Sequence, residues 1–326
     1  MTLVSLDAAT TRAALPFPAL IEALRQTFAE GVEVPLRHVH AIGSGPDLEP
    51  RGTLLLMPAW RPGRRGGLKT VAVFPGNAAA GLATLHSTYL LFDASTGAPL
   101  AFIDGDEITA RRTAAASALA ASFLARPAAR RLLVIGAGRI AALMAEAMAA
   151  VRRIDAVEVW SRRPEAALAL AGRLAASGFD ATACTDLASA VQRADIVSCA
   201  TLSTAALVQG DWLRPGTHLD LIGSFTPQMR ESDAGCFVRS RVFVDTPEAL
   251  AKSGDVLEAM RAGSFSAERL QGTLGDLCTG KVAGRTGDEE ITLFKSVGTA
   301  LEDLAAAELV YDATREAAPP ATAATS

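Results

Sequence analysis

The segment LLVIGAGRIA, residues 132–141, constrains the fold more than any other part of the chain. Gly136, Gly138 and Ala141 form a G-x-G-x-x-A pattern where a buried-strand pattern meets a helical pattern. In a dinucleotide-binding turn, the first glycine makes the tight turn and the second lets the backbone approach a pyrophosphate. The small third residue lets the helix pack on the strand, and the helix N-terminus faces the phosphates. The segment therefore predicts a dinucleotide site; the alternative is a glycine-rich turn of an unrelated α/β protein.

Strand and helix patterns alternate from residue 107 onward. We expect helices over 107–125, 140–151, 165–177 and 187–192, strands over 131–135, 156–160, 181–182, 196–200, 218–222 and 241–244, and one more amphipathic helix over 299–311. Such alternation predicts an α/β fold with a Rossmann-type, doubly wound parallel sheet that carries helices on both faces.

The first hundred residues have a different pattern. One helix over 18–30 is followed by strands over 36–41, 53–57, 68–74, 85–92 and 100–103, with turns rich in Gly, Pro or Ser between them. Consecutive strands without helices between them predict an antiparallel or mixed sheet, and therefore an N-terminal α+β domain.

Composition excludes several classes of protein. Of the 326 residues, 50% are hydrophobic and 20% are charged, which argues against a disordered chain, and a net charge of −4 offers no basic excess for nucleic acid. Charges or prolines interrupt the longest apolar stretches, so we expect no membrane-spanning helix. The N-terminus lacks the basic start of a signal peptide, so we expect no signal peptide. The four cysteines form no closely spaced pair, which is typical of reduced cysteines in a cytoplasmic protein.

The choice of cofactor depends on the residues that follow the second strand of the parallel sheet. An NAD enzyme usually has an acid there, which bonds the ribose 2′-hydroxyl. This chain has Ser161, Arg162 and Arg163 instead, and these side chains can bind a 2′-phosphate. We therefore expect NADP(H) to be preferred, with NAD(H) as the alternative. The other interpretation of the arginines is a solvated turn.

A series of ordered sequence blocks points to a family. The blocks are LLLMPAW (54–60), GLKTVAVFPGN (67–77), GLATLHSTYLLFDASTGAPLAFIDG (81–105), ITARRTAAASALA (108–120), VIGAGRIA (134–141), ADIVSCAT (194–201), LRPGTHLDLIGS (213–224), EEITLFKSVG (289–298) and LEDLAAAELVYD (301–312). In these blocks the chain resembles the ornithine cyclodeaminase/mu-crystallin family over nearly its whole length.

The resemblance implies a domain organisation. A Rossmann domain is expected over 113–298, and residues 1–112 and 299–315 are expected to form a substrate-binding and dimerisation domain that the C-terminal helix completes. The chain is expected to form a homodimer. The low-complexity residues 316–326 are expected to form a disordered tail.

The resemblance also implies hydride transfer between NAD(P) and the Cα atom of an amino or imino acid. An NADPH-dependent ketimine (cyclic imino acid) reductase or an amino-acid dehydrogenase fits best. The first alternative is a true ornithine cyclodeaminase, which forms L-proline and ammonia from L-ornithine. The second is a non-catalytic binding protein of mu-crystallin type. Intact Lys69 and Arg112 favour an enzyme, because a binder need not keep carboxylate-binding cations.

Cations for a substrate carboxylate are expected in the N-terminal domain. Lys69 lies in a strand pattern whose face is otherwise apolar, and a charge so placed is rarely buried without a partner. By resemblance, Arg37, Lys69 and Arg112 bind the carboxylate. The alternatives are solvation of Arg37 and Lys69 at a strand edge, and an ion pair of Arg112 with Asp104 or Glu107.

We assign the remaining site residues by role. The catalytic set is Lys69, Arg112 and, as a proton donor, His86. The substrate-binding set is Arg37, Lys69, Arg112, Met57 and Phe225. The cofactor-binding set is Thr84, Arg112, Gly136, Ala137, Gly138, Arg139, Ile140, Ser161, Arg162, Arg163, Thr201 and Ser296. No metal is expected, because His38 and His40 share a strand face without a third ligand at a usual spacing. Asp303 is expected to cap or pair within the last helix.

Two departures from the cyclodeaminases bear on the substrate. Aligned on Pro227 and Glu231, Phe225 stands where cyclodeaminases proper carry an aspartate, and Leu55 stands where they tend to carry an acid. Neither side chain can bind an amine or transfer a proton, and an unpaired, buried ornithine ammonium would cost several kcal/mol. The departures argue against ornithine and for a less polar imino or amino acid.

Overall fold

The computed structural model describes residues 3–43 and 51–316. The chain forms two compact units. Unit 1 comprises Met1–Ala23, Gly31–Arg112 and Ala300–Ser326, and unit 2 comprises Leu24–Glu30 and Thr113–Thr299. Helices α2 (Phe17–Glu30) and α3 (Gly105–Leu124) each continue from unit 1 into unit 2.

Unit 1 contains a mixed sheet of six strands, within the described residues, in the order β1-β6-β5-β4-β3-β2. The strands are β1 (Val4–Leu6), β2 (His38–Ile42), β3 (Gly52–Trp60), β4 (Arg65–Val73), β5 (Leu85–Asp93) and β6 (Pro99–Asp104). Strand β1 is parallel to β6, and the other neighbours are antiparallel, which confirms the expected mixed sheet. Gly63 and Gly97 adopt positive φ in the turns between β3 and β4 and between β5 and β6, where a side chain would be strained.

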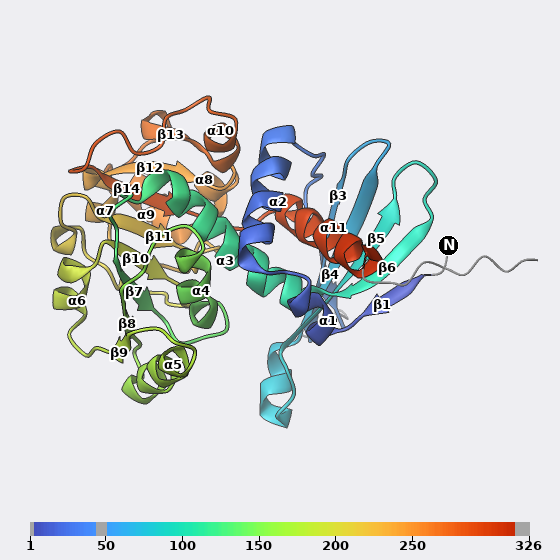
Figure 1. The fold of residues 1–326 in the computed structure, drawn as a ribbon, viewed down its shortest axis with the longest axis horizontal. Coiled ribbons are helices and arrows are strands. Elements are labelled where there is room, and N and C mark those ends of the chain that lie inside the picture. Colours follow the sequence, from blue (N-terminus) through green and yellow to red (C-terminus); the bar gives the residue numbers. More distant parts are fainter. Residues whose placement is uncertain (1–2, 44–50, 317–326) are drawn as a thin grey trace, which may run out of the picture. The chain divides into compact units, whose positions relative to one another are not determined.

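Helix α11 (Ala300–Glu316) packs across β3, β4 and β5 of this sheet (Figure 1). Its first eight residues, through Ala307, are all buried. The helix expected over 299–311 is confirmed, but it continues to Glu316, which we had expected in the tail; residues 317–326 lie outside the described part of the chain. The unit also contains the short helices α1 (Ala8–Ala13) and η1 (Pro75–Ala80).

Unit 2 contains a parallel sheet whose described strands follow the order β13-β12-β14-β11-β10-β7-β8-β9. They are β7 (Arg131–Ile135), β8 (Ala156–Trp160), β9 (Ala181–Ala183), β10 (Ile196–Cys199), β11 (His218–Leu221), β12 (Ser240–Val244), β13 (Leu270–Thr273) and β14 (Ile291–Lys295). The chain adds β8 and β9 on one side of β7 and then crosses to β10 on the other side, so the order reverses between β7 and β10. This reversal is the switch point of a doubly wound sheet and confirms the expected Rossmann-type fold.

Strands β13 and β14 were not expected from the sequence. Strand β14 lies between β11 and β12, and all five of its residues are buried. A short strand that is buried on both faces shows no alternation of apolar and polar residues, so its pattern does not differ from that of a buried helical segment.

The helix expected over 140–151 is wrong in part. The chain instead forms a 3₁₀ helix, η2 (Ala141–Leu143), and then a six-residue helix, α4 (Met144–Ala149). The first turn is tight because Leu143 N donates to Ile140 O, an i to i−3 bond.

The other helices of unit 2 lie close to their expected positions or in segments without an expected element. They are α5 (Pro164–Ala176), α6 (Leu187–Arg193), η3 (Gly210–Trp212), α7 (Ala234–Arg239), α8 (Ala249–Lys252), α9 (Gly254–Arg261), η4 (Ala267–Arg269) and α10 (Leu274–Cys278). Across the described residues, no helix combines the length and the apolar character needed to cross a membrane.

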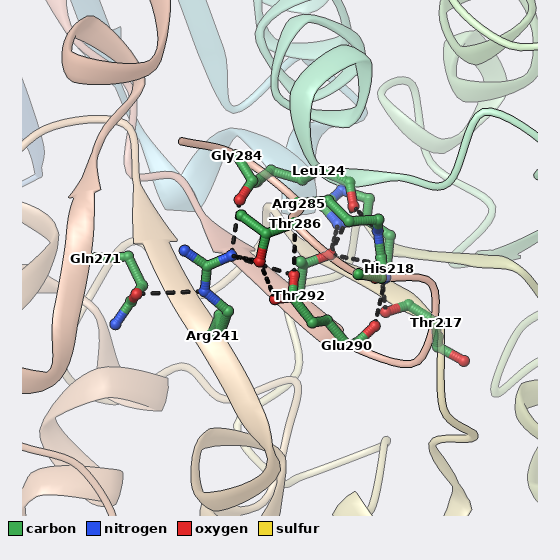
Figure 2. A network of polar contacts seen from close by, with 11 residues as sticks. Leu124, Thr217, His218, Arg241, Gln271, Gly284, Arg285, Thr286, Glu290 and Thr292 are labelled. Atoms are coloured by element: carbon green, nitrogen blue, oxygen red, sulfur yellow. Dashed lines mark hydrogen bonds and ion pairs between the residues drawn. The ribbon is translucent and has the colours of Figure 1, made fainter. Parts of the chain in front are cut away.

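A polar network ties the carboxyl end of α3 to the amino ends of β11 and β14 (Figure 2). Arg285 donates to the carbonyl oxygens of Leu124 (2.7 Å) and Thr217 (3.3 Å) and to the Thr292 hydroxyl (3.1 Å). Burial lowers the pKa of the neighbouring His218 to about 3, so its ring is neutral. A cation at a helix carboxyl terminus is stabilising. The network lies at the sheet edge opposite to the one where doubly wound folds bind ligands, so we interpret it as structural.

Candidate active-site elements

The glycine turn after β7 has the geometry that a dinucleotide needs. Gly136 has φ of +124°, and a Cβ atom there would lie 2.5 Å from the carbonyl oxygen of Ala200, so only glycine fits. Gly138 is exposed, and a Cβ atom there would meet no other atom within 4 Å. Ala141 is fully buried, as a close contact of helix and strand requires. The turn therefore leaves an open backbone surface that fits a pyrophosphate.

Most residues assigned to the cofactor follow the carboxyl ends of the parallel strands. Ala137, Arg139 and Ile140 lie in the turn after β7; Ser161, Arg162 and Arg163 follow β8; Thr201 follows β10; and Ser296 follows β14. The carboxyl ends of parallel strands meet at one edge, and doubly wound folds bind ligands at that edge. Thr84 and Arg112 belong to unit 1.

The segment after β8 carries no acid. Arg162 and Arg163 are exposed, and the Ser161 hydroxyl oxygen accepts a hydrogen bond from Arg163 N at 3.3 Å. An acid here would repel a 2′-phosphate, whereas a serine and two arginines offer donors.

In unit 1, one carboxylate bridges two buried cations. Asp303 Oδ2 lies 2.6 Å from Lys69 Nζ, and Asp303 Oδ1 lies 3.0 Å from Arg112 Nε. Arg112 also pairs with Glu302, and Lys69 Nζ donates to Thr109 Oγ1 at 3.3 Å. Lys69 and Arg112 are only 2% and 6% exposed, and both acids are fully buried. The structure thus brings together two of the three cations assigned to the substrate carboxylate.

The ion-pair partners of Arg112 and Asp303 differ from those considered in the sequence analysis. Arg112 does not pair with Asp104 or Glu107; Glu107 pairs with Arg12 instead. Asp303 does not act within its own helix, because α11 crosses the sheet and places this acid against β4 and α3. A signal was present in the sequence: two adjacent acids stand in the run LEDLAAA, where an otherwise apolar helix buries them.

The acids keep both cations of this cluster charged near neutral pH. Burial lowers the pKa of Lys69 to about 8, although Asp303 opposes the shift. Burial acts in the same direction on Arg112, but Asp303 and Glu302 outweigh it, so the pKa of Arg112 is raised. Burial would raise the pKa of Asp303, yet Arg112 and Lys69 leave it lowered. Lysine has three donor hydrogens and arginine has five, so the contacts above leave donors for a further carboxylate.

The sheet register assigns the other substrate residues to faces. Lys69 pairs with Met57 on one side and with Tyr89 on the other, and Leu55 lies two residues from Met57 on the same face. His86 pairs with Ala72, which stands three residues after Lys69 in β4. Side chains an odd number of residues apart in a strand lie on opposite faces, so the His86 side chain lies on the face opposite Lys69. We therefore do not retain His86 as the proton donor.

The other assigned residues come from other segments of the chain. Arg37 immediately precedes β2 and is half-buried, and Thr84 immediately precedes β5 and is exposed. Phe225 follows β11 in unit 2 and is 43% exposed. The rings of His38 and His40 stack at 6.3 Å, and no cluster of three metal-ligating side chains occurs among the described residues.

The doubly wound sheet and its glycine turn define a dinucleotide-binding class of protein. The model of the ornithine cyclodeaminase/mu-crystallin family matches residues 10–318, and the chain belongs to this family.

Three relatives narrow the activity. The chain is 41% identical over 292 residues to the Δ(1)-pyrroline-2-carboxylate reductase of Paracoccus denitrificans, a match that covers 89% of this chain and 90% of the relative. The Thermococcus litoralis Δ(1)-pyrroline-2-carboxylate reductase, solved in complex with NADH and L-proline, matches with a TM-score of 0.88 and 32% identity over 97% of this chain and 98% of that one. The iminosuccinate reductase of P. denitrificans, solved with NAD⁺, matches with a TM-score of 0.87 and 29% identity over 97% of both chains. These relatives are imino acid reductases, and two of them were solved with a nicotinamide cofactor.

Proposed function

We propose that this protein is an NADPH-preferring reductase of cyclic imino acids, with Δ(1)-pyrroline-2-carboxylate as the first candidate substrate and proline as its product. The observation that carries the proposal is the buried pair of Lys69 and Arg112, bridged by Asp303, in a chain of this family. A small α-imino acid offers one carboxylate to these cations and has no charged side chain that would need a partner.

The residues of the chain bind and orient the substrate. A bound, reduced nicotinamide supplies hydride to the imine carbon. Lys69 and Arg112 bind the carboxylate, and Asp303 keeps the two cations side by side. The imine nitrogen takes its proton from water before binding, so hydride addition completes the amine: one C–H bond forms and the C=N double bond becomes single.

Ornithine is a poorer substrate for this chain. Its side-chain ammonium would need a carboxylate partner, but Leu55 lies on the Lys69 face of the sheet and Phe225 lies in the loop after β11. An unpaired ammonium in a buried site costs several kcal/mol. Cyclisation of ornithine also needs acid–base help, which is typically worth about 10²–10⁴ in rate.

The deciding experiment follows NADPH oxidation with Δ(1)-pyrroline-2-carboxylate, other cyclic ketimines, and pyruvate with simple amines. NADH serves as the cofactor control and ornithine with NAD⁺ or NADP⁺ as the substrate control, with products identified by mass spectrometry. We expect turnover of at least one cyclic ketimine and negligible proline from ornithine. Robust proline formation from ornithine would favour a cyclodeaminase, and NADPH binding without any turnover would favour a binding protein.

The cofactor preference rests on the segment after β8. We expect NADPH to bind at least about tenfold tighter than NADH, because a 2′-phosphate gains charge-assisted hydrogen bonds worth roughly 1.5–3 kcal/mol. Arg162→Ala should remove most of this difference. Arg173→Ala, an exposed arginine on α5, is the matched control. Equal affinity of the unmodified protein for both cofactors would overturn the preference.

We also propose a homodimer. Strand β2 is an edge of the unit 1 sheet. Leu36, just before the strand, is 78% exposed, and Val39, within it, is 60% exposed. Exposed apolar side chains at an open edge favour association with another chain. Light scattering on the purified protein tests the oligomeric state. A monomer at micromolar concentration would contradict the proposed homodimer.

A further inference from the structure

Glu231 is a fully buried acid that the mechanism above does not use. One of its oxygens, Oε1, accepts hydrogen bonds from Thr201 N (2.7 Å) and from the Thr201 hydroxyl (2.8 Å). The other, Oε2, accepts a hydrogen bond from Gly223 N (2.6 Å). Thr201 follows β10 and Gly223 follows β11, so a single carboxylate joins the loops after two adjacent strands at the cofactor edge of the sheet.

The two loops approach each other closely at this point. A Cβ atom on Gly223 would collide with the carbonyl oxygen of Thr201 and with Glu231 Oε1, so the arrangement depends on glycine. Glu231 is itself held in place by its backbone: its N donates to Asp255 Oδ1 at 2.8 Å, and its carbonyl accepts from Leu207 N and Val208 N.

The titratable groups near Glu231 come from three elements. Lys295 of β14 is fully buried, donates to Leu221 O at 3.0 Å, and lies 3.8 Å from Asp255 Oδ2. Asp255 belongs to α9, and the thiol of Cys199 belongs to β10. Glu231 and Asp255 thus share one lysine.

We propose that Glu231 is a positioning residue: its carboxylate fixes the spacing of the Thr201 loop and the Gly223 loop, and thereby sets the affinity for the nicotinamide cofactor. The proposal rests on the proposed use of the carboxyl edge for the cofactor. The ionised acid accepts all three hydrogen bonds, two from backbone N–H groups and one from the Thr201 hydroxyl. A protonated Glu231 must direct its O–H toward the Thr201 hydroxyl, which would then accept instead of donate, and this changes the contact that holds the Thr201 loop.

Protonation of Glu231 falls in an accessible range of pH. Burial raises the pKa of Glu231 to about 7; Asp255 adds to this shift, and Lys295 and the hydrogen bonds from Thr201 oppose it. The carboxylate contacts are therefore complete above about pH 7 and are progressively lost below it. Cofactor affinity should fall as the pH falls through this range.

Folding stability should move in the opposite direction. Because the pKa is raised on folding, the folded state binds the proton more tightly than the unfolded state. The stability that this group contributes is present at low pH and is lost as the pH rises from about 4.5 to about 7. This trend in stability follows from the raised pKa whatever the role of Glu231, so the measurement that identifies a positioning role is the pH dependence of cofactor affinity.

The test uses Glu231→Gln and a matched control. Glutamine has one acceptor oxygen, so its amide group faces an N–H donor. Asp195→Asn is the control, because Asp195 accepts from Arg130 N (2.8 Å) and Arg131 N (3.0 Å) at the opposite end of β10. NADPH dissociation constants are measured by calorimetry between pH 5.5 and 8.5, beside unfolding midpoints.

We expect Glu231→Gln to weaken NADPH binding at pH 8 at least tenfold and to reduce its pH dependence to that of the 2′-phosphate, which takes up a proton near about pH 6. In Asp195→Asn, the NADPH affinity and its pH dependence should stay near those of the unmodified protein. Unchanged affinity and pH profile in Glu231→Gln would overturn the proposal. If that variant does not fold, Thr201→Val replaces it: loss of the hydroxyl contact should weaken binding severalfold while the pH dependence persists, and unchanged affinity would count against the proposal.

These outcomes are independent of the proposed substrate. NADPH binding is measured without an imino acid, so a protein that binds NADPH and reduces no ketimine contradicts the proposed function while it leaves the Glu231 test decisive.

Discussion

The two units each bury a cluster of charged side chains, but the clusters differ in balance. In unit 1, Lys69 and Arg112 face Glu302 and Asp303. In unit 2, three buried acids, Asp220, Glu231 and Asp255, lie near one lysine, Lys295. All of these groups are nearly or fully buried, so burial itself does not distinguish the two clusters.

The difference lies in the cations that touch each acid. Two cations contact Asp303, and its pKa is lowered in spite of burial. Burial raises the pKa of Asp220 to about 6 and that of Glu231 to about 7, because hydrogen bonds and one lysine offset it incompletely. At a similar degree of burial, Asp303 is therefore held ionised, whereas the pKa values of Asp220 and Glu231 are raised toward neutral pH. At neutral pH the first cluster offers positive charges to an anion, and the second offers hydrogen-bond acceptors to backbone N–H and hydroxyl groups.

The largest expected effect of a substitution is on stability in unit 1. Asp303→Asn leaves two buried cations with one acid, and removal of one partner from a buried ion pair costs about 3–5 kcal/mol. Asp312→Asn is the control, because the pair of Asp312 with Arg65 is half-exposed and such pairs are worth about 1 kcal/mol or less. Chemical denaturation at pH 7 measures both. Equal losses of unfolding free energy in the two variants would show that the balance of cations and acids in the unit 1 cluster does not matter.

The second effect is on turnover. Lys69→Ala should lower kcat/KM for the ketimine about ten- to hundredfold, since loss of a charge-assisted contact costs roughly 1.5–3 kcal/mol. NADPH affinity should stay nearly unchanged. Arg64→Ala, an exposed arginine in the turn before β4, controls for a general loss of positive charge. Full activity of Lys69→Ala, or loss of NADPH binding in its place, would contradict the assignment.

The third effect is a pH dependence of substrate binding. The pKa of Lys69 is about 8, so the lysine loses its charge above that pH, and KM for the carboxylate substrate should rise by up to about tenfold per pH unit. Folding stability should rise over the same range, because the unfolded lysine still binds a proton that the folded one has released. Lys69→Arg should remove this alkaline limb of the KM profile. A profile that keeps the limb in Lys69→Arg would place the titrating group elsewhere.

The smallest effect is expected in unit 2. Asp220 accepts hydrogen bonds from the hydroxyl groups of Ser117 (2.9 Å) and Ser198 (2.6 Å). Hydroxyl groups can also accept, so Asp220→Asn can keep both contacts, and we expect stability at pH 7 to change by less than about 1 kcal/mol. In the unmodified protein the raised pKa makes this group's contribution to stability fall as the pH rises from about 4 to about 6. Denaturation at pH 4 and pH 7 should show a smaller fall in Asp220→Asn than in the unmodified protein, because Glu231 contributes a fall of its own to both. A loss in Asp220→Asn as large as that in Asp303→Asn would remove the distinction between the clusters.

Local patterns predicted most of the framework. The strands over 131–135 and 156–160 match β7 and β8 residue for residue, because both alternate with helical patterns and Gly136 marks the end of β7. Strand β14 was missed, since a five-residue run buried on both faces has no periodicity of its own. Lys69 was found because a charge interrupts an apolar strand face. Asp303 was assigned to its own helix, because the crossing of α11 over the sheet depends on residues far away in the sequence.

The sequence by itself determined the glycine turn, the order of elements, the family and the absence of an acid after β8, because each depends on residues that are close together along the chain. The tertiary structure decided which charges meet. Asp303 stands 234 residues after Lys69 and 191 after Arg112, and the role of Glu231 appears only when the ends of β10 and β11 lie side by side. Pairing at such separations depends on how sheets and helices pack, and local pattern carries no record of that packing.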